Sequence, residues 1–306
     1  MSADAERDRS YRLERGEEAA AGVTRIAAGR AEEALERLRG FGSGEVDAAE
    51  AIHGARKDLK KLRTVLRLLR GSLPKATYRE EARRYRDAGR ALSASRDAEV
   101  KLAMLEGLGK RPGDLPGDAF ETWRAILDRD REAAANATRD LPAIEEAMTA
   151  IEAGLAGIEG WQLRSDSWDL IGNGLRRSYR RGRRTMRAAA EEPSEASFHE
   201  WRKRAKDLWY ALRILSDAWP APLEAAADEA HKLSELLGDH HDLALLREDL
   251  HQRRLGEEET RALEAAIDDR QGELVAEALA LGDRLYAEKP KAFDRRIRSY
   301  WRAWRG

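Results

Sequence analysis

The sequence contains no cysteine, which excludes disulfides, thiolate nucleophiles, zinc fingers and iron–sulfur clusters. A metal site would need histidine and carboxylate ligands instead. Aromatic residues make up only 6% of the 306 positions, and this composition favours helices over strands. No apolar run approaches the roughly 20 residues that span a bilayer, and the charged N-terminal segment lacks the apolar core of a secretory signal. We therefore expect a cytoplasmic protein.

Charge is abundant but balanced. Lysine and arginine number 56, aspartate and glutamate 57, so the formal net charge is −1. The overall charge therefore predicts no binding of a polyanion, and any such property would have to come from local clusters of one sign. Hydrophobic residues make up 42% of the chain, enough for a sizeable buried core.

Apolar residues recur at every third or fourth position along nearly the whole chain, and this spacing predicts an all-α fold. Pro142 is expected to interrupt one long helix, because proline removes a backbone donor and clashes with the preceding turn. The expected helices cover residues 17–39, 48–70, 75–106, 118–158, 168–190, 194–217, 221–255 and 257–287.

Two segments of the chain resemble each other at a constant spacing of 146 residues, the distance from position 53 to position 199. Residues 53–69 read HGARKDLKKLRTVLRLL, and residues 199–215 read HEWRKRAKDLWYALRIL. A shorter similarity sets residues 92–97 against residues 237–242. The pattern predicts one four-helix unit that has been duplicated.

The repeated helix carries its bases on one face. At about 100° per residue the bases of each copy fall into one stripe, with the apolar residues opposite. Neither stripe contains an acid, whereas an ordinary solvated face in a chain of balanced charge mixes the two signs. The stripes consist of His53, Arg56, Lys57, Lys60, Arg63 and Arg67 in the first copy and His199, Arg202, Lys203, Lys206 and Arg213 in the second.

The helix before the second copy is rich in arginine and contains no acid among these bases. Like charges four residues apart destabilise an isolated helix by roughly a few tenths of a kcal/mol per pair, so the cluster costs stability unless an anion neutralises it. Arginine grips phosphate oxygens with two donors, lysine offers a point charge and histidine a further donor, and long rows of all three suit a polymer of phosphates. The arginines that share a stripe here are Arg176, Arg180, Arg183, Arg184 and Arg187.

These features resemble the CHAD family of histidine-containing helical domains. The resemblance rests on the paired H-x-x-R-K-x-x-K helices that begin at His53 and His199, on residues 95–100 and 240–245, and on the arginine-rich residues 179–183. It implies two four-helix bundles related by pseudo-twofold symmetry around a basic central pore that binds inorganic polyphosphate. It also implies association with cellular polyphosphate, including granules in bacteria.

The resemblance runs from about Tyr11 to the last helices and implies a single domain over residues 11–306. Its halves would cover residues 11–158 and 159–290, followed by a basic aromatic tail at residues 291–306. Many CHAD domains follow a triphosphate-tunnel domain with an E-x-E-x-K signature, which this sequence lacks, so we expect a stand-alone domain.

Carried over to this sequence, the resemblance places the bases of all three stripes along the pore. The first helix of the N-terminal half is poorer in bases than its counterpart, which departs from the twofold pattern and predicts stronger binding by the second half. Secondary candidates for the site are Arg25, Arg30, Arg96 and His241.

A metal-dependent phosphohydrolase is one alternative, because His241 and Asp242 resemble the metal-binding doublet of HD phosphohydrolases. The doublet aligns with Arg96 and Asp97 in the first half, however, and an arginine cannot ligate a cation. The bases flanking His199 are expected to lower its pKa and favour a neutral, hydrogen-bonding ring over a phosphate acceptor. We expect no catalytic residue, no metal and no cofactor.

A nucleic-acid-binding protein is the other alternative, because basic helices also neutralise nucleic acid backbones. Base stacking would need aromatic side chains among the bases. Trp201, Trp209 and Tyr210 lie in the second copy, but the first copy has no aromatic residue at the matching positions, and Trp201 is expected in the core. The expected partner is inorganic polyphosphate.

Overall fold

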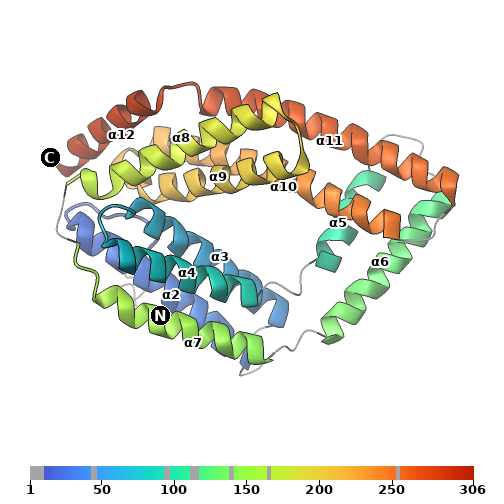
Figure 1. The fold of residues 1–306 in the computed structure, drawn as a ribbon, viewed down its shortest axis with the longest axis horizontal. Helices are drawn as coiled ribbons and strands as arrows, with labels where there is room; N and C mark the ends of the chain where they lie inside the picture. Colours follow the sequence, from blue (N-terminus) through green and yellow to red (C-terminus); the bar gives the residue numbers. More distant parts are fainter. Residues whose placement is uncertain are drawn as a thin grey trace.

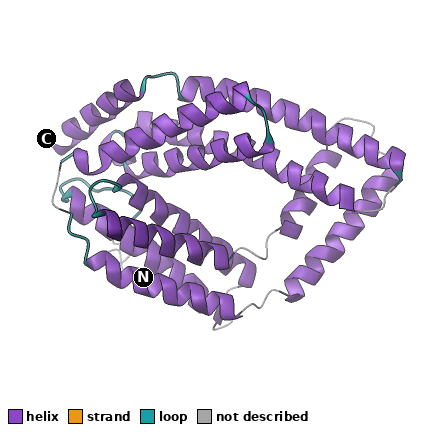
Figure 2. Ribbon diagram, viewed as in Figure 1, coloured by secondary structure: helices purple, strands orange, loops and turns teal. Residues whose placement is uncertain are grey.

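The computed structural model describes residues 10–42, 47–92, 97–110, 117–137, 141–163, 167–252 and 256–306, and every regular element within them is helical (Figure 2). The prediction of an all-α fold is confirmed. The α-helices, joined by the 3₁₀ turn η1 (Ser216–Ala218), are α2 (Ala19–Gly42), α3 (Ala48–Leu68), α4 (Lys75–Ala91), α5 (Asp97–Gly109), α6 (Gly117–Ala137), α7 (Leu141–Glu159), α8 (Asp169–Glu191), α9 (Glu195–Ile214), α10 (Pro220–Gln252), α11 (Glu257–Leu285) and α12 (Pro290–Arg305).

One predicted helix, over residues 75–106, is two helices in the structure. α4 ends at Ala91, where the backbone N–H of Leu92 closes the last turn on the carbonyl of Ala88, and α5 begins at Asp97. Leu92 leaves the helical conformation with a ψ of 17°, and residues 93–96 lie outside the described part of the chain. The segment predicted as one helix interrupted near Pro142 forms α6 and α7, which pack on different partners, α6 on α5 and α7 on α2 and α4; residues 138–140 between them lie outside the described part of the chain.

The helices form two packed groups (Figure 1). α2, α3, α4 and α7 make one bundle, while α8, α9, α10 and α11 make the other. The predicted apolar stripe of α3 is buried at Leu59, Leu62 and Leu66. Burial of such stripes drives the assembly of each bundle.

Helices α5 and α6 lie between the bundles at the end of the molecule distant from both termini (Figure 1). They pack against each other and reach α10 and α11 of the second bundle. Asp249 of α10 holds this contact, since it accepts from the indole Nε1 of Trp123 at 3.3 Å and from Nζ of Lys101 at 3.0 Å. The segment expected as the first four-helix half, residues 11–158, therefore consists of a bundle and a separate helical pair.

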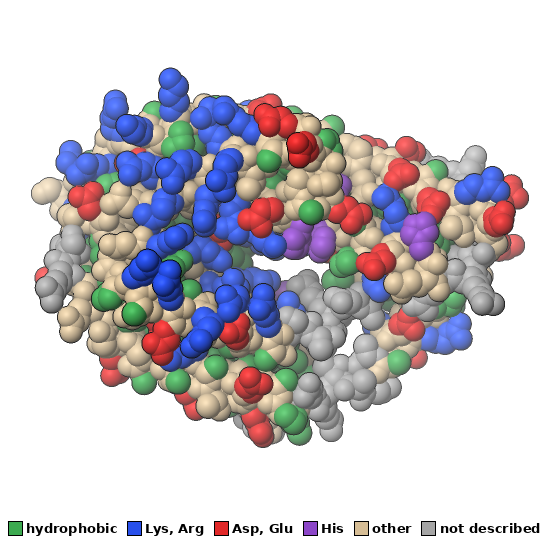
Figure 3. Space-filling view, in the orientation of Figure 1, with side chains coloured by type: hydrophobic (Ala, Val, Ile, Leu, Met, Phe, Trp, Pro, Cys, Tyr) green, Lys and Arg blue, Asp and Glu red, His purple; other side chains and the backbone are tan. Residues whose placement is uncertain are grey.

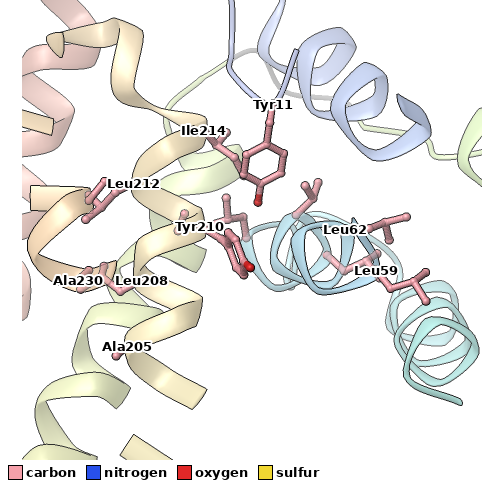
Figure 4. Packing of buried hydrophobic residues seen from close by; sticks show 14 of the residues in the cluster. Tyr11, Leu59, Leu62, Ala205, Leu208, Tyr210, Leu212, Ile214 and Ala230 are labelled. Atoms are coloured by element: carbon pink, nitrogen blue, oxygen red, sulfur yellow. The ribbon is translucent and has the colours of Figure 1, made fainter. Parts of the chain in front are cut away.

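The N-terminal segment ties the bundles together at the other end. Tyr11 lies between α3 and α9 (Figure 4), and its hydroxyl donates to the carbonyl of Lys61 at 3.3 Å. Its ring meets that of Tyr210 edge-on, with centroids 6.3 Å apart. Two residues on, the N–H of Leu13 donates to the carbonyl of Ile214 at 2.9 Å. Burial raises the pKa of Tyr11 well above its usual value, so this phenol stays neutral at the junction.

The basic aromatic tail forms helix α12, which packs along α8. Phe293 stacks on Tyr179 with ring centroids 4.0 Å apart, and Trp301 lies 5.9 Å from Trp168. The carboxylate of Asp294 accepts from Nε1 of Trp168 at 3.0 Å. The apolar face of the tail is therefore buried in the fold. None of the described helices is long and apolar enough to cross a membrane.

Candidate anion-binding site

Arginine side chains from both bundles meet in one pocket where α3 and α4 face α8 and α9. We call it the arginine pocket. It contains five arginines and one acid, so its charge is strongly positive. Its lining residues are Arg67, Arg70, Tyr78, Gly174, Arg177, Ser178, Arg181, Arg204 and Asp207.

Gly174 sets the distance between the two walls of the arginine pocket. A Cβ atom at this position would overlap the backbone of Leu68, in the last turn of α3. The absent side chain therefore lets α8 approach α3 backbone to backbone. In this arrangement the guanidinium of Arg177 donates to the carbonyl of Arg70, just beyond α3, and the guanidinium of Arg70 lies 5.7 Å from the ring centroid of Tyr78.

Asp207 is the only acid among the described residues that line the arginine pocket, and it is buried at 7% exposure. Its carboxylate lies 3.0 Å from Nη1 of Arg67 on α3 and 2.9 Å from Nη1 of Arg204 on its own helix. Arg204 also lies 3.2 Å from Glu200. Asp207 thus serves as an internal counter-ion that spans the two bundles, and it was not expected from the sequence.

The other arginines of this region repel one another in a partly desolvated setting. Burial, followed by the charge of Arg67, lowers the pKa of Arg63 to about 10. The pKa of Arg177 is lowered by burial and then by Arg70, and that of Arg181 by burial and then by Arg204. These shifts mean that the folded state disfavours the positive charge it assembles, so an anion bound here would relieve the repulsion.

The predicted stripe of α3 is present as a row of bases that leads along the helix to Arg67. His53, Lys57 and Lys60 are exposed, while Arg56 is half-buried and donates from Nη1 to the carbonyl of Leu92 at 3.3 Å. In the orientation of Figure 1, Figure 3 shows Lys and Arg side chains along the face where the bundles meet, with histidines beside an opening in that face.

A histidine pair occupies the other end of α9. The rings of His199 and His241, the latter on α10, lie 4.3 Å apart between centroids. Burial, then His241, Lys203 and Arg202, lower the pKa of His199 to about 4, and burial also lowers the pKa of His241. The sequence predicted a lowered pKa for His199 from its flanking bases, and burial is the larger cause of that shift. Both rings are neutral at pH 7.

Two further bases of α9 are held by acids. Arg202 lies 3.8 Å from Asp242 of α10 and against the backbone at Gly238, where a Cβ would lie 3.0 Å from its guanidinium. Lys203 is exposed and lies 3.6 Å from Glu200. Lys206, one turn on, is half-buried. The second stripe is therefore partly neutralised by acids, which lie off the stripe in the sequence.

Arg213 lies at the end of α9 near the N-terminal segment. Its guanidinium is 5.9 Å from the ring centroids of both Tyr11 and Trp209. These aromatic faces hold the cation by cation–π attraction. Arg213 is thus part of the junction between the bundles rather than a lining residue of the arginine pocket.

None of the arginines in the predicted stripe of α8 is among the residues that line the arginine pocket. Arg176 lies 4.0 Å from Asp294 of α12, and Nε of Arg183 donates to the carbonyl of Tyr286 at 3.1 Å. Arg180, Arg184 and Arg187 are exposed. The pocket is lined instead by Arg177 and Arg181, which belong to the same arginine-rich segment but lie off that stripe.

The secondary candidates for the site are not among the residues that line the arginine pocket. Arg25 binds Glu17 at 2.8 Å and donates to the carbonyls of Ser10 and Arg12, so it organises the N-terminal segment. Arg30 is buried and pairs with Asp58 at 3.0 Å between α2 and α3. Arg96 lies outside the described residues, and His241 belongs to the histidine pair.

The aromatic side chains of α9 are not free to stack on bases. Trp201 is fully buried, as predicted, and Tyr210 is 5% exposed. Trp209 is half-buried, with its ring 4.4 Å from that of Tyr210 and 3.8 Å from that of His231. Stacking by these residues would require the core to open, which weakens the nucleic-acid alternative.

The two residues of the HD-like doublet contact bases of α9. Asp242 lies beside Arg202, and His241 stacks against His199. Among the residues that the structure describes, no three histidine, aspartate or glutamate side chains are grouped so that they would hold a metal ion. No described contact favours the phosphohydrolase alternative.

Sequence reasoning missed four arginines of the pocket: Arg70, Arg177, Arg181 and Arg204. One signal was available on α8, because Gly174, Arg177 and Arg181 follow one another at intervals of three and four residues. A glycine within a helix often marks the face that another element approaches closely. Arginines on the same face as Gly174 are therefore the ones expected to line the contact. No comparable signal marks Arg204.

The comparisons with known proteins agree with this architecture. The CHAD domain family matches residues 29–251. Among solved structures, "PptA from Streptomyces chartreusis" superposes with a TM-score of 0.61 at 17% identity, covering 87% of this chain and 98% of that one. The CHAD domain from the plant Ricinus communis superposes with a TM-score of 0.52 at 20% identity, covering 96% of both chains.

These low identities make the structural likeness a statement about the fold. No curated protein matches the chain significantly. The family match is independent of the superpositions and spans well over half of the sequence. On that ground the chain belongs to the CHAD domain family.

Proposed function

We propose that this protein binds inorganic polyphosphate by multivalent contacts of arginine, lysine and histidine, without a chemical step. The observation that carries the proposal is the arginine pocket, where two bundles bring five guanidinium groups around a single buried carboxylate. Phosphate oxygens accept two hydrogen bonds from one guanidinium and would supply the negative charge that the pocket lacks.

The length of the basic rows favours a polymer over a single phosphate. From His53 to Arg67 the stripe of α3 extends about 21 Å, at about 1.5 Å per residue. A linear polyanion would contact successive bases along this row and enter the arginine pocket at its end. We propose that this row and the matching row on α9 line a central basic pore.

Exchanged charges support a duplicated origin of the bundles. Asp58 and Lys61 of α3 form a pair at 3.2 Å, and Arg204 and Asp207 of α9 form a pair at 2.9 Å. At the spacing of 146 residues Asp58 corresponds to Arg204, and Lys61 to Asp207. The two copies thus keep an ion pair at one position with its signs reversed.

Binding to the pore would attach the protein to cellular polyphosphate, including granules.

The proposal is tested by comparing long-chain polyphosphate, orthophosphate and duplex DNA at matched salt concentration. We expect polyphosphate to bind at least tenfold more tightly than DNA, and orthophosphate to show no saturable binding in that range. The logarithm of the affinity should fall linearly with the logarithm of salt concentration, with a slope set by the number of contacts. Equal affinity for DNA, or release of orthophosphate upon addition of a divalent metal, would refute the proposal.

The histidine pair predicts a pH dependence of binding. His199 has a pKa of about 4 in the free protein, and a bound polyanion would raise this pKa. Affinity should then rise as pH falls toward 5.5, because the complex takes up a proton. We expect an increase of about threefold to tenfold between pH 7.5 and 5.5, provided that the polyanion returns this pKa to about its usual value, because a shift that stops well short of 5.5 would leave the ring neutral in both states.

The His199→Asn variant is the control for this effect, and it should show a flatter pH profile. Identical profiles for the variant and the parent would contradict the prediction. The folded pKa of His199 lies below its usual 6.5, so the fold itself loses stability as pH falls from about 6.5 toward 4. Circular dichroism at each pH therefore accompanies the titration.

A further inference from the structure

Helix α12 carries a basic stripe that the arginine pocket does not use. Lys291, Arg295, Arg298 and Arg302 follow at intervals of four, three and four residues and share one face. Lys291, Arg295 and Arg302 are exposed, and none of them pairs with an acid among the described residues. The Nε atom of Arg298 is buried without a hydrogen-bond partner.

The outward face of α8 lies next to this stripe. α8 and α12 pack antiparallel, because Trp168 contacts Trp301 and Tyr179 contacts Phe293. Asp294 sits at the seam and is occupied by Trp168 and Arg176. The exposed bases of α8 have no acidic partner in the described part of the chain; they are Arg180, Arg184 and Arg187.

These bases are electrostatically continuous with the arginine pocket. Burial and the charge of Arg70 are the larger causes of the lowered pKa of Arg177, and the charge of Arg180 adds to them. Burial, Arg204 and Arg70 are likewise the larger causes of the lowered pKa of Arg181, and Arg184 adds to them. Arg177 and Arg181 line the pocket, so the two faces of α8 share one positive potential. Figure 3 shows Lys and Arg side chains from the meeting line of the bundles to the part of the molecule where Figure 1 places α8 and α12.

We propose that α12 and the outward face of α8 form a second anion-binding surface, the outer basic surface, onto which a long polyphosphate chain continues from the arginine pocket. This inference rests on the proposed function and extends it to chain length. α12 lies beyond the family match at residues 29–251, so the family match itself says nothing about this surface. A short polyphosphate would occupy the pocket alone, and a long one would contact both surfaces.

A membrane surface suits this stripe less well. A helix that lies on a lipid bilayer needs a free apolar face beside its bases. In α12 that face is covered, since Phe293, Ile297 and Trp301 are each less than 5% exposed. Trp219, which is 52% exposed, lies against Tyr300 with ring centroids 4.6 Å apart, on the side of the helix opposite the stripe. Binding of a polyanion, in contrast, requires only the positive charge of the stripe.

The test compares two double variants with the same change in net charge. Arg295→Glu with Arg302→Glu alters the outer basic surface, and Arg129→Glu with Arg261→Glu alters exposed positions on α6 and α11. We expect the first variant to lower affinity for long-chain polyphosphate at least tenfold and to leave affinity for a short oligophosphate within twofold. The second should change neither by more than twofold. Anionic and neutral phospholipid vesicles serve as additional probes.

Each outcome has a distinct meaning. If the parent protein binds neither polyphosphate, the proposed function fails. If it binds both and the two double variants behave alike, the outer basic surface fails while the function stands. Binding of anionic vesicles that the α12 variant abolishes, with polyphosphate affinity unchanged, would overturn the inference in favour of a membrane contact. Equal losses for short and long chains would place α12 within the primary site and also overturn it.

Discussion

Replacement of both Arg177 and Arg181 by glutamate will lower the affinity for long-chain polyphosphate by about a hundredfold. Both side chains line the arginine pocket, and both have pKa values lowered by burial and neighbouring arginines. Each substitution removes a charge-assisted contact, worth about 1.5 kcal/mol or more, and adds repulsion. Two such losses correspond to about two powers of ten in affinity.

The same variant will keep its fold. Arg177 loses its hydrogen bond to the carbonyl of Arg70, but a guanidinium cluster that the folded state disfavours is relieved at the same time. We expect the thermal midpoint to change by only a few degrees. The matched control is again the pair Arg129→Glu and Arg261→Glu, which gives the same net charge at distant exposed positions. An equal loss of affinity in the control would show that overall charge, and not the pocket, governs binding.

Removal of a negative charge from the arginine pocket should have the opposite effect on affinity. Asp207→Asn removes the only acid among the described lining residues, whose carboxylate lies 3.0 Å from Arg67 and 2.9 Å from Arg204. The freed guanidinium groups become available to phosphate, so affinity should rise by about threefold to tenfold. Stability should fall at the same time by about 1 to 3 kcal/mol, less than for a fully buried pair, because both arginines lose a charged partner but keep some contact with water. A fall in affinity would mean that Asp207 positions the arginines rather than competing with phosphate.

The rows of bases on α3 and α9 were predictable because they follow helical periodicity. The spacing that places His53, Lys57 and Lys60 together also places Leu59 and Leu62 in the core, and both placements agree with the structure. A helical stripe depends only on positions within one segment. Its composition and direction can therefore be deduced before the tertiary structure is known.

The arginine pocket was not predictable in this way, because its walls come from four helices. The arginines of α8 surround much of the helix, so periodicity alone does not decide which of them face α3. The small size of Gly174 decides it, through contact with Leu68 in another bundle. Asp207 is similar: in the sequence it is an acid off the basic stripe, and only the packing of α3 on α9 brings it to Arg67.

The replacement Gly174→Ala tests whether this close approach builds the pocket. The new Cβ would overlap the backbone of Leu68, and backbone atoms cannot turn aside as a flexible side chain does. α8 must therefore move away from α3. We expect the free energy of unfolding to fall by about 3 kcal/mol, at the upper end of the usual cost of overpacking. Affinity for polyphosphate should fall at least tenfold, because Arg177 and Arg181 move with α8.

Gly272→Ala is the matched control for this prediction, since Gly272 lies within α11 and a Cβ there meets nothing within 4 Å. Alanine in that helix should raise stability by about 0.5 to 1 kcal/mol and leave binding unchanged. Chemical denaturation and polyphosphate titration measure both quantities on each variant. If Gly174→Ala is as stable as the parent and binds equally well, the two bundles tolerate separation at this point. Convergence of the arginines would then have to depend on the ion pairs of Asp207 rather than on the contact of α8 with α3.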